Sequence, residues 1–248
     1  MAYKPVIFKL VETNNPFEVL SDFVRDWYEI NLRFISYDYS DLFSVKLSNN
    51  VNKLLNFLVS LNCTTISGKK RLAYNAFGYI FNAQSFLIRY DEDLKFLIFL
   101  QEGKQDFYYG IPFEQLQEEN PPIYRIVRNR NKEFIFFEDS KLIDFLVFHL
   151  CVNASKIGVK GYSMFLDEGE ECLNKMEIFY RLFEHKTVFD KVIVLEKENA
   201  IATIKKGENI EDILWINKWV KDEKDFTKEI VDIFDWNGWS DNTGRYKL

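Results

Sequence analysis

The stretch Tyr108 to Ile126, YYGIPFEQLQEENPPIYRI, places a glycine, an acidic connector and a proline pair between two apolar segments. Proline fixes φ and withholds a backbone donor, so regular secondary structure rarely continues through it. We therefore predict that Pro112 and the pair Pro121 and Pro122 make the connector a rigid corner between two strands. A direct binding role for the same segment is the alternative interpretation.

Single residues of this corner have separate predicted roles. Gly110 is predicted to end the first strand, because glycine adopts backbone conformations that are closed to larger residues. Asn120 is held extended by the proline that follows it, and its side chain is predicted to form a turn with its own backbone. The residues predicted to anchor the corner on the core are Tyr109, Ile111, Ile123 and Tyr124.

Short apolar segments separated by polar turns continue on both sides of the corner and predict a meander of antiparallel strands. Three strands precede the corner, with turns at Asp91–Asp93 and at Glu102–Lys104, and two strands follow it as a hairpin. The segments are FLIRY (86–90), KFLIFLQ (95–101), QDFYYGI (105–111), PPIYRIV (121–127) and EFIFFE (133–138).

Apolar residues three and four positions apart predict helices before and after these strands. Asn15 is predicted to cap the first helix. Asp139 or Ser140 is predicted to cap the helix after the hairpin, which is apolar nearly all round and should therefore be central to the core. The predicted helices cover residues 14–31, 49–61, 141–154, 170–185 and 223–236, and a further hairpin turning at 198–199 covers 191–207.

Composition and organisation favour one folded body. Of the 248 residues 47% are hydrophobic and 17% aromatic, which is enough for a substantial core. No Pro-, Gly- or Ser-rich linker and no repeat interrupts the chain, so the economical interpretation is a single α+β domain over residues 1–248. Its curved, mostly antiparallel sheet is expected to pack against helices, with Trp27, Phe145 and Leu146 in the core.

The charge excludes some classes of partner. A net charge of −6 argues against a general binder of nucleic acid or of anionic membranes, because such proteins need cationic surface. The three cysteines are far apart and suggest neither a disulfide framework nor a zinc site. Neither an export signal nor a membrane span is apparent, so we expect a cytoplasmic protein.

The usual signatures of catalysis and cofactor binding are missing from the sequence. It contains no phosphate-binding glycine loop, no HExxH, no CxxC pair and no GxSxG elbow. Its two histidines are His149, on the most apolar predicted helix, and His185, at a predicted helix C-terminus, and structural roles are favoured for both. We predict no enzyme activity, no cofactor and no metal site. A metal- or carboxylate-dependent hydrolase, the alternative, would need several acids to converge with a histidine.

Three motifs together resemble one family. They are Tyr109-Gly110-Ile111, Asn120-Pro121-Pro122-Ile123-Tyr124 and the segment Ser140 to Leu146, which includes Phe145. With Trp27-Tyr28 in the opening helix, this combination is similar to the SUKH superfamily of bacterial immunity proteins and fungal cell-wall regulators. The resemblance implies an α+β domain without catalytic residues that recognises protein partners.

In bacteria, the resemblance implies an immunity protein that neutralises a polymorphic toxin domain, encoded by a neighbouring gene. An intracellular scaffold or regulator with no toxin partner is the alternative. Nuclease-type toxins carry cationic grooves, so an acidic face would attract them. Together with exposed aromatic side chains, the predicted contact residues are Asp91, Glu92, Asp93, Glu114, Glu118 and Glu119.

Overall fold

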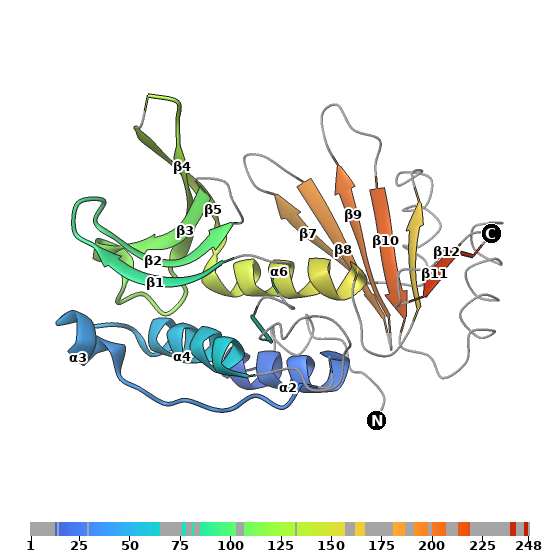
Figure 1. Cartoon of the computed structure of the whole chain (residues 1–248), viewed down its shortest axis with the longest axis horizontal. Helices are drawn as coiled ribbons and strands as arrows, with labels where there is room; N and C mark the ends of the chain where they lie inside the picture. The colour runs from blue at the N-terminus through green and yellow to red at the C-terminus, as the bar shows by residue number, and fades with distance from the viewer. Residues whose placement is uncertain are drawn as a thin grey trace. The chain divides into compact units, whose positions relative to one another are not determined.

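The computed structural model describes residues 13, 15–28, 30–64, 76–77, 81, 85–102, 107–131, 133–156, 162–166, 181–186, 191–197, 200–206, 213–218, 239–241 and 246–247. In these ranges the chain forms helices and two antiparallel sheets (Figure 1), which confirms the predicted α+β class. The chain groups into two compact units, residues 30–146 and residues 1–29 with 147–248. A single domain over residues 1–248 stays a prediction.

The sheet of the first unit is the predicted meander around the corner. Its strands are hydrogen-bonded in the order in which they follow along the chain. They are β1 (Ser85–Asp91), β2 (Phe96–Glu102), β3 (Phe107–Pro112), β4 (Pro122–Arg128) and β5 (Phe134–Lys141). The predicted turn between β1 and β2 and the predicted hairpin of β4 and β5 are confirmed. The predicted turn at 102–104 lies mostly outside the described residues.

Helices accompany this sheet, and in Figure 1 α4 and the start of α6 lie below strands β1 to β3. The elements are α3 (Tyr39–Phe43), α4 (Asn49–Cys63), the short 3-10 helix η1 (Phe113–Gln115) and α6 (Leu142–Lys156). Helix α4 begins where Ser48 Oγ accepts the backbone N–H of Val51 at 3.2 Å. Its apolar stripe is fully buried, as the residue spacing predicts.

The core of this unit forms where β2 and β3 meet the first turns of α6. The ring of Phe145 lies 5.7 Å from that of Phe99 and 5.0 Å from that of Tyr109, and Phe145 and Leu146 are fully buried. These core predictions are confirmed. Of the residues predicted to anchor the corner, Tyr109, Ile111 and Ile123 are buried. Tyr124 is half-buried and packs against the hydrophobic cluster of Phe96.

The N-terminal cap of α6 differs from the prediction. Asp139 and Ser140 belong to β5, and the α6 backbone N–H of Ile143 is accepted at 3.1 Å by the side chain of Asn120. The N–H of Leu142 is accepted by the carbonyl of Pro121 at 2.9 Å. The corner itself therefore caps α6. Asn120 Oδ1 thus bonds a distant helix instead of forming the predicted local turn.

Glycine is favoured at position 110 for a reason other than the one predicted. It lies within β3, opposite Ile98 and Tyr124, and its φ is outside the left-handed region. A Cβ at this position would lie 3.0 Å from the carbonyl oxygen of Leu97 and 3.3 Å from a ring carbon of Phe96. Close approach of the neighbouring strand, and not an unusual backbone conformation, thus disfavours a side chain here.

The second unit contains α2 (Pro16–Tyr28) and the remainder of α6. The stripe of α2 is buried as predicted, Trp27 included, and Tyr28 Oη donates to the carbonyl of Leu150 at 3.4 Å. The side chain of Asn15 donates to Glu18 at 3.0 Å at the start of α2.

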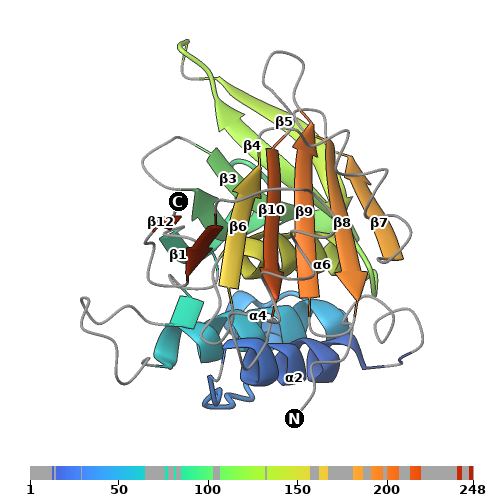
Figure 2. The ribbon, with the colours of Figure 1, turned by 90° about the vertical axis from the view of Figure 1, so that its right-hand side faces the viewer.

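A seven-stranded sheet, of which the sequence suggested only one hairpin, completes this unit. Its strands are β6 (Tyr162–Leu166), β7 (Arg181–Lys186), β8 (Lys191–Lys197), β9 (Ala200–Lys206), β10 (Ile213–Lys218), β11 (Trp239–Asp241) and β12 (Tyr246–Lys247). Figure 2 shows β6, β10, β9, β8 and β7 side by side, in the order of the pairing. The predicted hairpin over 191–207 is confirmed by the pairing of β8 with β9.

Residues 181–185 correct the helix predicted over 170–185. They belong to β7, and His185 pairs with Val192 of β8, so this histidine is not at a helix C-terminus. The pairing with β8 overrides the apolar spacing, which is ambiguous in so short a segment. The rest of that predicted helix, and the one over 223–236, lie outside the described residues.

Candidate functional site

The fold brings two of the predicted acidic segments together. At the beginning of η1 the backbone N–H of Phe113 donates to the carbonyl of Lys95, in the turn between β1 and β2, at 3.0 Å. The rings of Tyr90 and Phe113 stack at 4.0 Å with an angle of 6° between their planes. Glu114, the next residue along, is therefore adjacent to the turn that carries Asp91 to Asp93.

The three acids of the turn have different environments. One oxygen of the Asp91 carboxylate accepts the backbone N–H of Leu94 at 3.0 Å, and the other pairs with Arg89 at 2.8 Å. Glu92 and Asp93 are exposed. Asp91 therefore shapes the turn, whereas Glu92 and Asp93 present their charge to solvent.

The acids of the connector also divide into two kinds. Glu114 and Glu118 are exposed. Glu119 bonds Asn50 in the first turn of α4: its carboxylate accepts the Asn50 backbone N–H at 3.2 Å, and its carbonyl accepts the Asn50 amide at 2.9 Å. A carboxylate at a helix N-terminus is stabilised by the helix dipole. The principal role of Glu119 is thus structural, although the sequence groups it with the other acids.

A row of aromatic side chains runs beside these acids. Neighbouring ring centroids in this aromatic row are 5.1, 6.1, 5.7 and 4.0 Å apart. The aromatic row consists, in order, of Tyr37, Tyr39, Phe43, Tyr90 and Phe113. It links α3, β1 and η1, which are distant in sequence.

Apolar surface is exposed at the α3 end of this row. Tyr37 is 49% exposed and Leu42, on α3, is 58% exposed. Phe34, earlier in the segment that leads to α3, is 79% exposed. Side chains of this size and exposure beside carboxylates are suited to contacts with another protein.

The segment that leads to α3 is held by a column of polar side chains on α4. Alternate backbone N–H groups are accepted by side chains four residues apart, at 2.8 to 3.1 Å. The donor and acceptor pairs of this polar ladder are Arg33 with Thr64, Ile35 with Ser60, Tyr37 with Asn56 and Tyr39 with Asn52. Two extended residues advance about 6.6 Å and four helical residues about 6.0 Å, so the two periods nearly match.

The polar ladder positions the segment that carries the exposed Tyr37 and leads to Leu42. It was not predicted from the sequence. Its signal is present as Asn52, Asn56 and Ser60, a polar residue at every fourth position of the predicted helix, and Thr64 continues the spacing just beyond its end. Such a column usually indicates a solvated helix face, and sequence alone does not distinguish that from a face that binds backbone.

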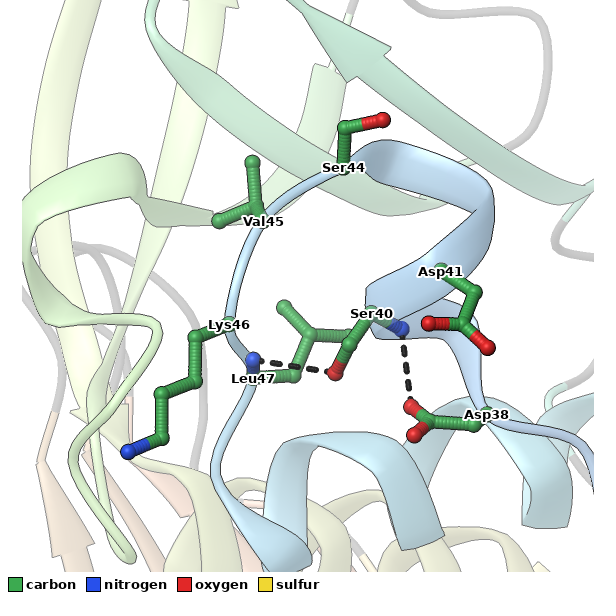
Figure 3. Close-up of a pocket in the computed structure, with 7 residues that line it drawn as sticks. All are labelled: Asp38, Ser40, Asp41, Ser44, Val45, Lys46 and Leu47. Carbon is green, nitrogen blue, oxygen red and sulfur yellow. Dashed lines mark hydrogen bonds between the residues drawn. The ribbon is translucent and has the colours of Figure 1, made fainter.

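An open hollow of about 590 Å³ lies at α3 (Figure 3), lined by Asp38, Ser40, Asp41, Ser44, Val45, Lys46 and Leu47. Asp38 caps α3 by accepting the Ser40 N–H at 2.9 Å and also accepts the Asn52 amide at 2.9 Å. The Ser40 backbone bond, reinforced by the Ser40 hydroxyl and by Asn52, lowers the pKa of the Asp38 carboxyl. The Ser40 hydroxyl in turn accepts the Leu47 N–H at 3.2 Å. The polar atoms of Asp38 and Ser40 that line the hollow are thus already engaged in hydrogen bonds that cap α3 and close the loop after it.

Within the described ranges, no three side chains among His, Cys, Asp and Glu come close enough to hold a metal ion. His149 lies in α6, half-buried, with its ring 5.1 Å from that of Phe148. His185 lies in β7. Neither histidine lies on the segments that carry the predicted acids.

The motif residues on which the family resemblance rests lie in strands or at the start of a helix, where they support the fold. Tyr109, Gly110 and Ile111 lie on β3 and are buried, Pro121 and Pro122 lead into β4, and Asn120 caps α6. Protein-family models, curated proteins and solved structures give no match to the chain. Among the described helices none is long and apolar enough to cross a membrane.

Proposed function

We propose that the chain is a non-enzymatic immunity protein that binds and neutralises a toxin domain encoded by a neighbouring gene. The contact would be made by the acidic aromatic surface, which we define as α3, the turn at Asp91–Asp93, and η1 with Glu118. The observation that supports this proposal is the Phe113 to Lys95 hydrogen bond, which holds two acidic segments beside the aromatic row. The toxin as partner, and the SUKH type of fold, rest on the sequence resemblance.

The physical argument has a kinetic and a thermodynamic part. Exposed Glu92, Asp93 and Glu114 would steer a cationic groove towards the surface, which raises the association rate at low salt. Tyr37 and Leu42 would supply apolar contact area that slows dissociation. An interface of ordinary size, roughly 800 Å² per partner, would suffice to occlude a small active site.

Survival during co-expression tests the proposal. The native chain is expressed with the toxin domain encoded beside it, and we expect protection. The double variant Asp93→Lys with Glu114→Lys should lower the association rate and weaken protection. The control Glu133→Lys, beside β5, matches the single variant Glu114→Lys in charge and should protect fully if its thermal stability is unchanged.

Three outcomes separate the alternatives. Death of cells that express the native chain would overturn the immunity function. Binding of the toxin without protection would favour the intracellular scaffold or regulator. Full protection by the Asp93 and Glu114 variant, at an unchanged association rate, would show that the partner binds elsewhere.

The absence of catalysis is tested with the purified protein. We expect no nuclease, esterase or phosphatase turnover, with or without divalent metal ions. Turnover that persists through purification and disappears in His149→Ala would contradict a binding function.

A further inference from the structure

Strand β5 has an outer edge that pairs with no strand in the described part of the chain. It is the last strand of the five-stranded sheet and pairs with β4 on its inner side. Ile135 is 41% exposed and Phe136 is 40% exposed. Neither a proline nor a lysine interrupts residues 134–138. An exposed apolar edge of this kind is a template for a further strand.

The direction of each backbone group of β5 follows from the hairpin. The Asn129 N–H donates to the carbonyl of Glu133 at 2.9 Å. Hydrogen-bonded positions alternate along an antiparallel pair. The backbone groups of Ile135 and Phe137 therefore also form hydrogen bonds with β4, opposite Val127 and Arg125. The N–H and C=O groups of Phe134, Phe136 and Glu138 therefore point to the outer edge.

We propose that β5 pairs antiparallel with β5 of a second copy of this chain, about a two-fold axis at Phe136. Phe136 then bonds its own equivalent, and Phe134 bonds Glu138 of the second copy. This interface is separate from the acidic aromatic surface and does not rest on the proposed function.

The pairing of outward residues and the charges of the strand select this register. A two-fold axis perpendicular to the sheet can lie at any position from 134 to 138, because hydrogen-bonded and non-hydrogen-bonded pairs alternate in an antiparallel pair. An axis at Ile135 would pair only Phe134 with Phe136, and an axis at position 137 only Phe136 with Glu138. An axis at Glu138 would place two like charges directly opposite each other, which is destabilising. An axis at Phe134 would run the second strand past the turn at residues 129–133, with few pairs formed. Only the axis at Phe136 uses all three outward residues.

In that register the side chains are also complementary. The Arg128 guanidinium lies over the Phe134 ring, 5.8 Å from its centroid. Glu138 of the second copy would come opposite Phe134 on the same face, within reach of Arg128. Symmetry repeats this ion pair on the other side of the axis. Between them, the two Phe136 rings would meet, each already stacked on Phe96 at 5.1 Å within its own copy.

Two charge-reversal variants, measured separately and as a mixture, test the dimer without any partner protein. The measurement is sedimentation velocity at chain concentrations from low to high micromolar. We expect the native chain to dimerise reversibly. Arg128→Glu and Glu138→Arg should each raise the dissociation constant about tenfold, because an ion pair becomes a repulsion in both copies. An equimolar mixture of the two variants should dimerise as the native chain does, since opposite charges face each other again.

Controls keep the result interpretable. Arg130→Glu, in the turn beyond the paired residues, should dimerise like the native chain. Phe136→Asp should abolish dimers. A thermal unfolding curve of this variant shows whether it still folds. If the variant does not fold, the mixture of the two charge-reversal variants decides between dimer and monomer.

A chain that stays monomeric at all concentrations, or dimers unaffected by both charge reversals, would overturn the proposal. If the chain is monomeric and Phe136→Asp loses toxin binding, the edge is occupied by the partner and not by a second copy.

Discussion

Replacing Asn56 by alanine would remove the best-connected member of the polar ladder. Its Oδ1 accepts the Tyr37 N–H at 2.8 Å, and its Nδ2 donates to the Tyr37 carbonyl at 2.9 Å and to the Asn52 carbonyl at 3.0 Å. Each net hydrogen bond contributes about 0.5–1.5 kcal/mol, so the two bonds to Tyr37 contribute about 1–3 kcal/mol. Alanine regains about 0.6 kcal/mol in helix propensity. The free energy of unfolding should therefore fall by about 0.5–2.5 kcal/mol.

Two measurements check this loss. Urea unfolding gives the change in free energy, and amide hydrogen exchange locates it. In Asn56→Ala the amide of Tyr37 should exchange faster, while amides in the middle of α4 keep their protection. Asn49→Ala is the control, because Asn49 is exposed at the start of α4 and has no side-chain hydrogen bond within the described residues.

Unchanged exchange at Tyr37, together with an unchanged urea midpoint, would refute the ladder. Faster exchange throughout α4 would also count against it, because the loss would then come from the helix and not from the docked segment. In either case another contact would have to position α3 and the exposed end of the aromatic row.

Other substitutions test the core, the corner and the cap of α3. Phe145→Ala should lower the free energy of unfolding by about 3–5 kcal/mol in urea, since a fully buried aromatic is lost; an unchanged midpoint would exclude Phe145 from the core. Asn120→Ala should lower it by about 1 kcal/mol through loss of the bond to Ile143, with Asn120→Asp retaining most of it, and an equal loss in both variants would contradict the cap. Hydrogen bonds hold the pKa of Asp38 below its usual value, so the Ser40 bond should persist on acidification until the pH falls through that lowered pKa. A Ser40 amide shift that titrates at the usual pKa of a free aspartate would contradict this.

Local patterns in the sequence predicted the elements whose partners are close along the chain. The meander of β1 to β5 follows from short apolar segments and polar turns, and the stripes of α2 and α4 follow from apolar spacing. In both cases a residue's neighbours within a few positions determine its environment. The buried positions of Trp27, Phe145 and Leu146 could therefore be predicted without a structure.

Features that depend on distant contacts could not be predicted in this way. The cap of α6 comes from Asn120 and not from the adjacent Asp139 or Ser140. Residues 181–185 have helical spacing but pair as β7, because a neighbouring strand supplies their hydrogen bonds. Glu119 was grouped with the other acids, although its contact with α4 spans 69 positions of sequence.

The connector after β3 is both a corner and part of the candidate site, because its two ends have different neighbours. Phe113 bonds the turn between β1 and β2 and leaves Glu114 exposed beside it. Further along, Leu116, Glu119 and Asn120 bond the first turns of α4 and α6. Reversing the charge of Glu119 would place a cation at a helix N-terminus and destabilise the fold. A loss of binding after that change would not identify a contact, whereas Glu114 separates binding from stability.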